Sequence, residues 1–122
     1  MPLTRTRAEL FDELVLDAVE EVEEAVHGDD ELARRVAAVA LAVEEVPPDD
    51  SADRADEGSV PLARTEAAVR DRPARLVLYR RPIELRAPDP QERPLLVHEV
   101  VVEELADLLG VPVERLDPDE PD

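Results

Sequence analysis

The chain has 122 residues, which is enough for one domain with a single modest hydrophobic core. Thirty-two Asp and Glu residues stand against 14 basic residues, all of them arginine, and give a formal charge of −18. This balance excludes a protein that binds nucleic acid or an anionic membrane through excess positive charge. The lack of cysteine excludes disulfides and thiolate metal sites. We expect a cytoplasmic protein, because no apolar run reaches the roughly 18 residues of a membrane span and no signal peptide is recognisable.

A capping box predicts where the first helix begins. Thr6 and Glu9 have the spacing at which each side chain binds a backbone N–H of the other residue. Behind them, apolar residues recur every three or four positions, as on one face of a helix. These residues are Phe11, Val15, Ala18, Val22 and Ala25. The pattern predicts an amphipathic helix over residues 6–27, ended by Gly28.

A strand is predicted after a short capped turn. Asp29 can cap a helical turn over residues 32–35, after which large apolar residues alternate with alanine. The large residues are Val39, Leu41 and Val43. Pro47 ends this strand, and the polar, charged residues 48–59 are predicted to form a flexible loop.

Residues 75–80 are predicted to form a second strand. Leu76 and Leu78 point to one face, and Val77 and Tyr79 point to the other. Pro82 follows closely and cannot donate a ladder hydrogen bond, so we expect this strand to lie at an edge of the sheet or to bend there.

A last helix is predicted from about Pro94 to Gly110, a residue that favours helix termination. The fold class is therefore α+β, with a small, mostly antiparallel sheet packed against an N-terminal and a C-terminal helix. Residues 1–116 are expected to form one domain, followed by a disordered acidic tail over residues 117–122. The sheet residues Val39, Leu41, Val43, Leu76 and Leu78 are expected to face the helix residues Phe11, Val15, Val22, Val102, Leu105 and Leu109.

One stretch of the last helix could carry chemistry. His98-Glu99 begins like the zinc-binding motif HExxH, but Val102 occupies the position of the second histidine and cannot bind metal. On a helix, His98 also lies on the same apolar stripe as Val102 and Leu105. We therefore expect a core or boundary histidine with one hydrogen-bond partner. Glu103 and Asp107 lie on roughly the opposite side of the helix, one turn apart.

The order of these elements resembles the small, single-domain zincin-like metallopeptidases of bacteria, the minimal zincins. The resemblance extends over residues 6–116 and is most specific in the strand 76–82 and in the ending Gly110…Glu114-Arg115-Leu116. It implies a zincin-like fold whose last helix carries the motif HExxHxxGxxD.

Alignment on Gly110 assigns the family's site positions. By this resemblance, the first zinc histidine corresponds to Glu103, the catalytic glutamate to Glu104, the second histidine to Asp107 and the third ligand to Val113. The general base is kept, while all three metal positions differ. Zinc prefers imidazole and thiolate donors, and a hard cation needs about six oxygens, so we expect at most weak metal binding at Glu103 and Asp107 and no cofactor.

These substitutions predict a degenerate zincin-like domain that acts as a binding or regulatory protein. Its groove would be bordered by the strand residues Leu76, Leu78 and Tyr79, which would hold an extended peptide by main-chain pairing. The acidic positions favour a peptide or a basic protein as partner. One alternative is an active metallopeptidase with rearranged ligands that recruits His98 or His27. Others are an acidic protein that occupies the basic site of a nucleic-acid-binding partner, and a solvated helix face with no site.

Overall fold

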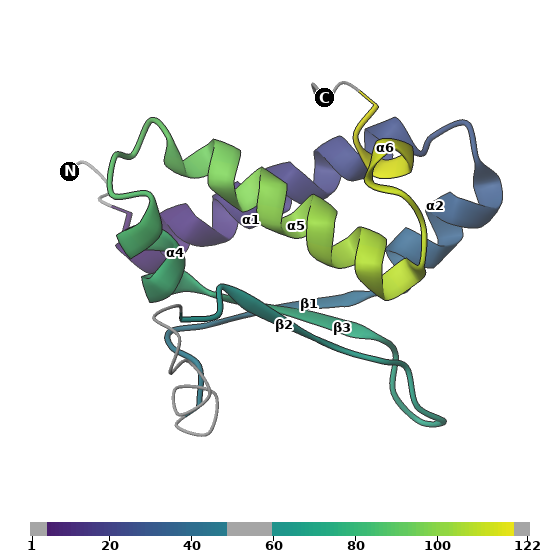
Figure 1. Cartoon of the computed structure of the whole chain (residues 1–122), viewed down its shortest axis with the longest axis horizontal. Helices are drawn as coiled ribbons and strands as arrows, with labels where there is room; N and C mark the ends of the chain where they lie inside the picture. Colours follow the sequence, from purple (N-terminus) through teal and green to yellow (C-terminus); the bar gives the residue numbers. More distant parts are fainter. Residues whose placement is uncertain (1–4, 49–59, 119–122) are drawn as a thin grey trace.

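The computed structural model describes residues 5–48 and 60–118 as a layer of helices over one face of a small sheet (Figure 1). The predicted α+β class is confirmed. Most of the predicted loop and the last residues of the predicted tail lie outside the described residues. The elements are α1 (Arg7–Ala25), α2 (Asp30–Ala37), β1 (Ala40–Glu44), β2 (Ala63–Glu66), β3 (Arg75–Tyr79), α4 (Arg80–Arg86), α5 (Arg93–Leu109) and α6 (Val113–Leu116). No helix among the described residues is both long and apolar enough to cross a membrane.

The ends of the main helices follow the local sequence. The capping box of α1 is confirmed, since the Glu9 backbone N–H donates to Thr6 Oγ1 at 3.0 Å and the Thr6 N–H donates to Glu9 Oε1 at 2.8 Å. Asp29 caps α2, which is a full two-turn helix and not the single turn predicted. Gly110 ends α5 with a φ of 70°, in the left-handed region that favours glycine.

The sheet order corrects the prediction for the strand over residues 75–80. The order is β1-β3-β2, so β3 is the central strand and not an edge strand. The sheet is mixed, because β3 pairs parallel with β1 and antiparallel with β2. The short connection between β2 and β3 imposes the antiparallel pairing, and the insertion of β3 beside β1 makes the second pairing parallel.

Pro82 does not interrupt the ladder, because the chain has already left the sheet when it reaches this residue. The strand ends at Tyr79, and α4 follows directly at Arg80. Pro82 lies in the first turn of α4, where a helix does not require its missing N–H group. The helix α4 was not predicted from the sequence, because the proline was interpreted as an edge-strand signal.

The inner face of the sheet and the helices form one aliphatic core, as predicted. Leu76 and Leu78 of β3 are fully buried in the same cluster as Phe11 of α1 and Leu105 of α5. Three further predicted facing residues pack against this cluster and are partly buried: Leu41 and Val43 of β1, and Val39 just before it. This packing fixes which side of α5 faces the protein interior.

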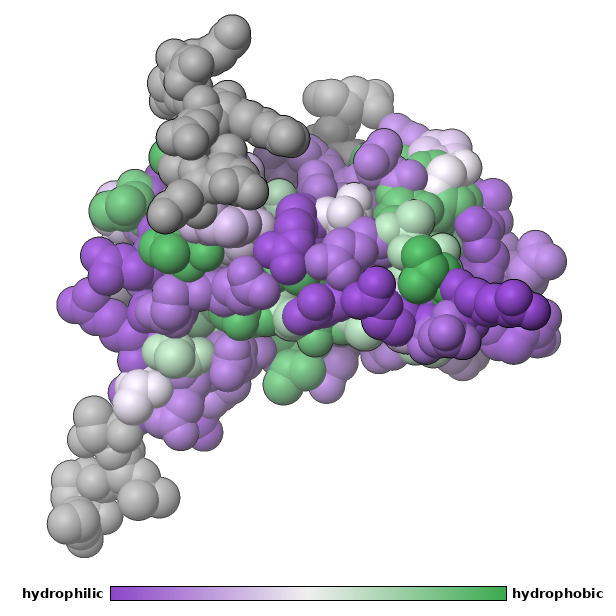
Figure 2. Space-filling model, turned by 90° about the horizontal axis from the view of Figure 1, so that it is seen from below, coloured by the Kyte–Doolittle hydropathy of each residue, from purple (hydrophilic) through white to green (hydrophobic). Residues whose placement is uncertain are grey.

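On the outer face of the sheet, one arginine joins all three strands. Arg64 of β2 donates to the Tyr79 hydroxyl of β3 at 2.7 Å and to both carboxylate oxygens of Glu44 of β1 at 3.3 and 3.4 Å. It also donates to Glu66 at 3.0 Å, and its guanidinium carbon lies 5.9 Å from the centroid of the Tyr79 ring. Figure 2 views the molecule from this side and shows hydrophobic patches separated by hydrophilic residues. Arg64 therefore helps to cover Tyr79, which is fully buried although none of the helices in the described part of the chain covers this face.

We predict that Arg64→Met lowers the free energy of unfolding by about 1–2 kcal/mol, a modest value because the side chain is one-third exposed and its ion pairs are screened. Tyr79→Phe should cost about 1 kcal/mol. The double variant should lose less than the sum, since both changes remove the same hydrogen bond. Urea unfolding of the four proteins measures this coupling.

The matched control is Arg70→Met, on the connection between β2 and β3, which should change stability by less than about 0.5 kcal/mol. Strict additivity of the Arg64 and Tyr79 substitutions would contradict a role for this hydrogen bond.

Candidate functional site

The helix α5 carries the positions that the resemblance aligns with HExxH. Its apolar side faces the core, and the helix packs against α1 on one flank and against the edge strand β2 on the other. Glu103 and Asp107 are exposed, whereas Glu104 is half-buried. Val113 of α6, the position of the third ligand, packs partly against the core.

The environment of Glu104 favours its protonated form. Burial raises the pKa of the Glu104 carboxyl, and the nearby charges of Asp107 and Glu103 raise it further. In the family's motif, neutral histidines occupy those two neighbouring positions. Here the neighbours are acids, and their negative charges make the ionised Glu104 carboxylate less stable than it would be beside neutral side chains.

The side chains at the aligned positions do not fit a zinc ion. They offer only carboxylates from one helix and a valine, whereas the zinc site that the motif HExxHxxGxxD implies combines two imidazoles with one carboxylate. Within residues 5–48 and 60–118, no three His, Cys, Asp or Glu side chains are grouped so that they could hold a metal ion. The zinc chemistry of the family therefore has no matching donor set in the described part of this chain.

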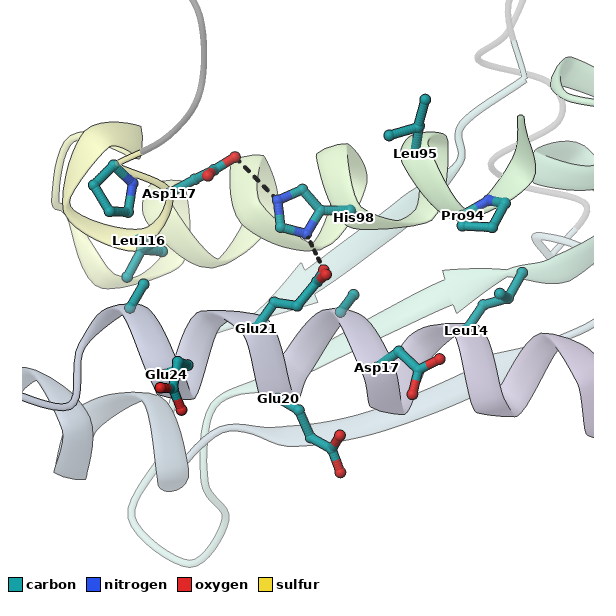
Figure 3. Close-up of a pocket in the computed structure, with 13 residues that line it drawn as sticks. Leu14, Asp17, Glu20, Glu21, Glu24, Pro94, Leu95, His98, Leu116 and Asp117 are labelled. Carbon is teal, nitrogen blue, oxygen red and sulfur yellow. Dashed lines mark hydrogen bonds and ion pairs between the residues drawn. The ribbon is translucent and has the colours of Figure 1, made fainter. Parts of the chain in front are cut away.

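His98 lies on the flank of α5 that faces α1, and both of its ring nitrogens are engaged (Figure 3). Nε2 is 3.0 Å from Asp117 Oδ2, in a hydrogen bond. Nδ1 is 2.8 Å from Glu21 Oε1. The two atoms are close enough to form an ion pair, but their geometry is not that of a hydrogen bond. His98 thus has two partners and not the single partner expected. One of them, Asp117, was predicted as the start of a disordered tail and is held by its hydrogen bond to His98.

Burial alone would lower the pKa of His98, but the hydrogen bond to Asp117 and the charge of Glu21 outweigh it, so the pKa is raised above 6.5. The ring links α1, α5 and the end of α6. His98 and Glu104 are six residues apart, which places them about 120° apart around the helix. His27 is exposed in the turn after α1. The structure therefore does not bring either histidine together with Glu104.

The prediction that β3 is the edge strand that binds a peptide is wrong, because β3 lies in the centre of the sheet. Leu76, Leu78 and Tyr79 are fully buried in β3, and both edges of that strand are already paired. The edge strand beside α5 is β2, for which no strand is predicted from the sequence. The alternation of Ala63 and Thr65 with charged residues was the available signal.

Comparison with known proteins agrees with this architecture. The family model for zincin-like metallopeptidases matches residues 36–121, from the end of α2 through α6. The match covers well over half of the chain, and the chain belongs to the zincin-like metallopeptidase family, as predicted. No curated protein matches the chain.

We predict that Glu104→Gln stabilises the protein at neutral pH. Because the folded-state pKa is raised, the ionised carboxylate destabilises the fold above that pKa, and the penalty disappears as the pH falls towards the unfolded value of 4.5. Unfolding midpoints in guanidinium chloride between pH 4.5 and 8 measure this difference. Glu99→Gln, at an exposed position of the same helix, is the control. A glutamine variant that is less stable than the parent at pH 7 would contradict the assignment.

For His98 the sign is opposite. A raised folded-state pKa means that the stabilisation is complete below about pH 6.5 and is lost as the pH rises through the folded pKa. The stability advantage of the parent over His98→Gln should therefore shrink between pH 6 and pH 9. Thermal unfolding across this range tests it, with His27→Gln as the control. A constant difference would show that His98 acts only through packing.

Proposed function

We propose that this chain is a non-catalytic member of the zincin-like family and acts as a binding or regulatory protein. The observation that carries the proposal is the donor set on α5. Carboxylates occupy the positions of both zinc histidines, and Val113 occupies the position of the third ligand. Without imidazole donors, zinc would not be held in the geometry that lowers the pKa of a bound water to about 7.

The state of Glu104 supports the same proposal. A metallopeptidase glutamate accepts a proton from a metal-bound water and must be ionised to do so. Glu104 keeps the position of that glutamate, and burial together with two neighbouring acids raises its pKa. Without imidazole donors beside it to hold a metal, its carboxylate has no activated water from which to accept a proton.

The edge strand β2 supports a binding role. It lies beside α5, and among residues 5–48 and 60–118 no strand pairs with its outer edge. An extended peptide could add to this edge through main-chain hydrogen bonds. Glu103, Glu104 and Asp107 on the adjacent helix would favour basic side chains in such a peptide. A peptide or basic protein is thus the partner class that we propose for this site.

The second candidate is an active metallopeptidase with rearranged ligands, which the retained Glu104 favours. It would have to recruit His98 or His27. Recruitment of His98 would break its contacts with Asp117 and Glu21. This cost makes the non-catalytic function the better supported one.

We predict no one-to-one zinc complex tighter than about 10 µM for the parent protein, because it lacks the donors that give structural zinc sites about 10–16 kcal/mol of binding free energy. Equilibrium dialysis measures this binding. The triple variant Glu103→His, Asp107→His, Val113→Asp rebuilds the family's donor set and should gain zinc binding. A peptide library with added zinc, manganese or cobalt should not be cleaved by the parent.

Two results would contradict the proposal. Tight zinc binding by the parent that is abolished in Asp107→Ala would show that the carboxylates suffice. Chelator-sensitive cleavage that disappears in Glu104→Gln would establish the metallopeptidase. If neither the parent nor the triple variant bound zinc, the assignment of α5 as the former active-site helix would be wrong.

A further inference from the structure

A groove of about 820 Å³ lies between α1 and α5 and is closed at one end by α6 (Figure 3). It is on the flank of α5 that carries His98, away from the position of Glu104. Its lining combines aliphatic and acidic side chains. Leu14 of α1 and Leu95 of α5 contribute apolar surface, and Leu116 of α6 lies at the closed end.

The acidic side of the groove has no internal counterions. Asp17, Glu20 and Glu24 line it along α1, and no basic side chain among residues 5–48 and 60–118 pairs with any of them. The single imidazole in the groove is already held between Glu21 and Asp117. The groove therefore presents uncompensated negative charge next to apolar surface.

The apolar part of the groove includes a leucine that is largely exposed to solvent. The side chain of Leu95 is 73% exposed, although it borders a groove that Leu14 and Pro94 also line. Burial of this leucine by a partner would be favourable at roughly 25 cal/mol per Å² of apolar surface. Exposed aliphatic residues rimmed by charge are typical of an interaction surface.

We propose that this groove binds a basic, amphipathic helical segment of a partner protein. Arginine or lysine side chains would pair with Asp17, Glu20 and Glu24, and aliphatic side chains would cover Leu95 and Leu14. A helix is the fitting form, since the groove is walled by helices and offers no strand edge for main-chain pairing. A second copy of the chain does not fit this charge pattern, because each copy carries a charge of −18. This site is separate from the β2 edge proposed above.

The test uses three fluorescein-labelled helical peptides. The first has arginine on one face and leucine on the other, the second has serine in place of leucine, and the third has glutamate in place of arginine. Anisotropy titrations on the full chain should show saturable binding of the first peptide only. Raising the salt concentration should weaken this binding without abolishing it, because the apolar contact is not screened.

Matched variants locate the peptide. Glu20→Lys with Glu24→Lys should weaken binding about tenfold, since two attractive pairs become repulsive. Asp12→Lys with Asp71→Lys makes the same charge change at two exposed positions that do not line the groove, and its effect should stay within about twofold. Leu95→Ser should weaken binding, and Leu85→Ser, at an equally exposed leucine outside the groove, should not.

Four outcomes would overturn the proposal. Equal weakening by both charge pairs, or equal binding of the serine peptide, would show a diffuse charge effect without a docking site. Absence of saturable binding would show that the groove has no affinity for this chemistry. Self-association that is lost in Leu95→Ser would assign the groove to a second copy. The triple variant that rebuilds the zinc donors should bind the first peptide like the parent, so this test and the zinc test fail independently.

Discussion

The packing of α5 against the inner face of the sheet and against α1 is the constraint on which the other features depend. The core is almost entirely aliphatic, with Phe11 as its one aromatic side chain among the described residues, so no single large contact dominates it. Val97, Val101 and Leu105 of α5 are each buried to 99% or more. Their burial sets the rotation of the helix, because a turn of one residue would move all three out of the core. That rotation turns His98 towards Glu21 of α1 and leaves Glu104 about 120° away around the helix.

The distribution of arginine explains where the acidic charge remains effective. With 14 basic residues against 32 acids, most carboxylates cannot be paired internally. Arg64 and Arg80 are used where strands and helices meet: Arg64 bridges the outer face of the sheet, and Arg80 donates to Glu45 after β1 and to Glu84 in α4. Burial and like charges instead raise the pKa of Glu104. The basic side chains thus support the sheet, while the Glu104 region and the groove beside α1 keep acidic character.

Local signals in the sequence were sufficient for the two long helices α1 and α5 and for the core-facing residues, and insufficient for the helix α4 and for strand order. The capping box at Thr6 and the terminator at Gly110 act through nearest neighbours, so their outcome can be read from a few residues. The central position of β3 depends on a strand that pairs from elsewhere in the chain, and β2 has only four residues with partly exposed faces. For the same reason the second partner of His98 was missed: Glu21 is 77 residues away along the chain, and no periodicity relates the two.

The proposed loss of the metal donors is compatible with the family fold because the aligned positions do not contribute to the core. Glu103 and Asp107 are exposed, so a carboxylate in place of an imidazole at these positions would leave the core unchanged. The effect of the acidic side chains is electrostatic and local: in addition to burial, their charges raise the pKa of Glu104. The buried stripe of α5 separates this flank from the groove that contains His98. The side chains on one flank can therefore change while the other flank keeps its charge and shape. The two surfaces are coupled only through the stability of α5, which carries both.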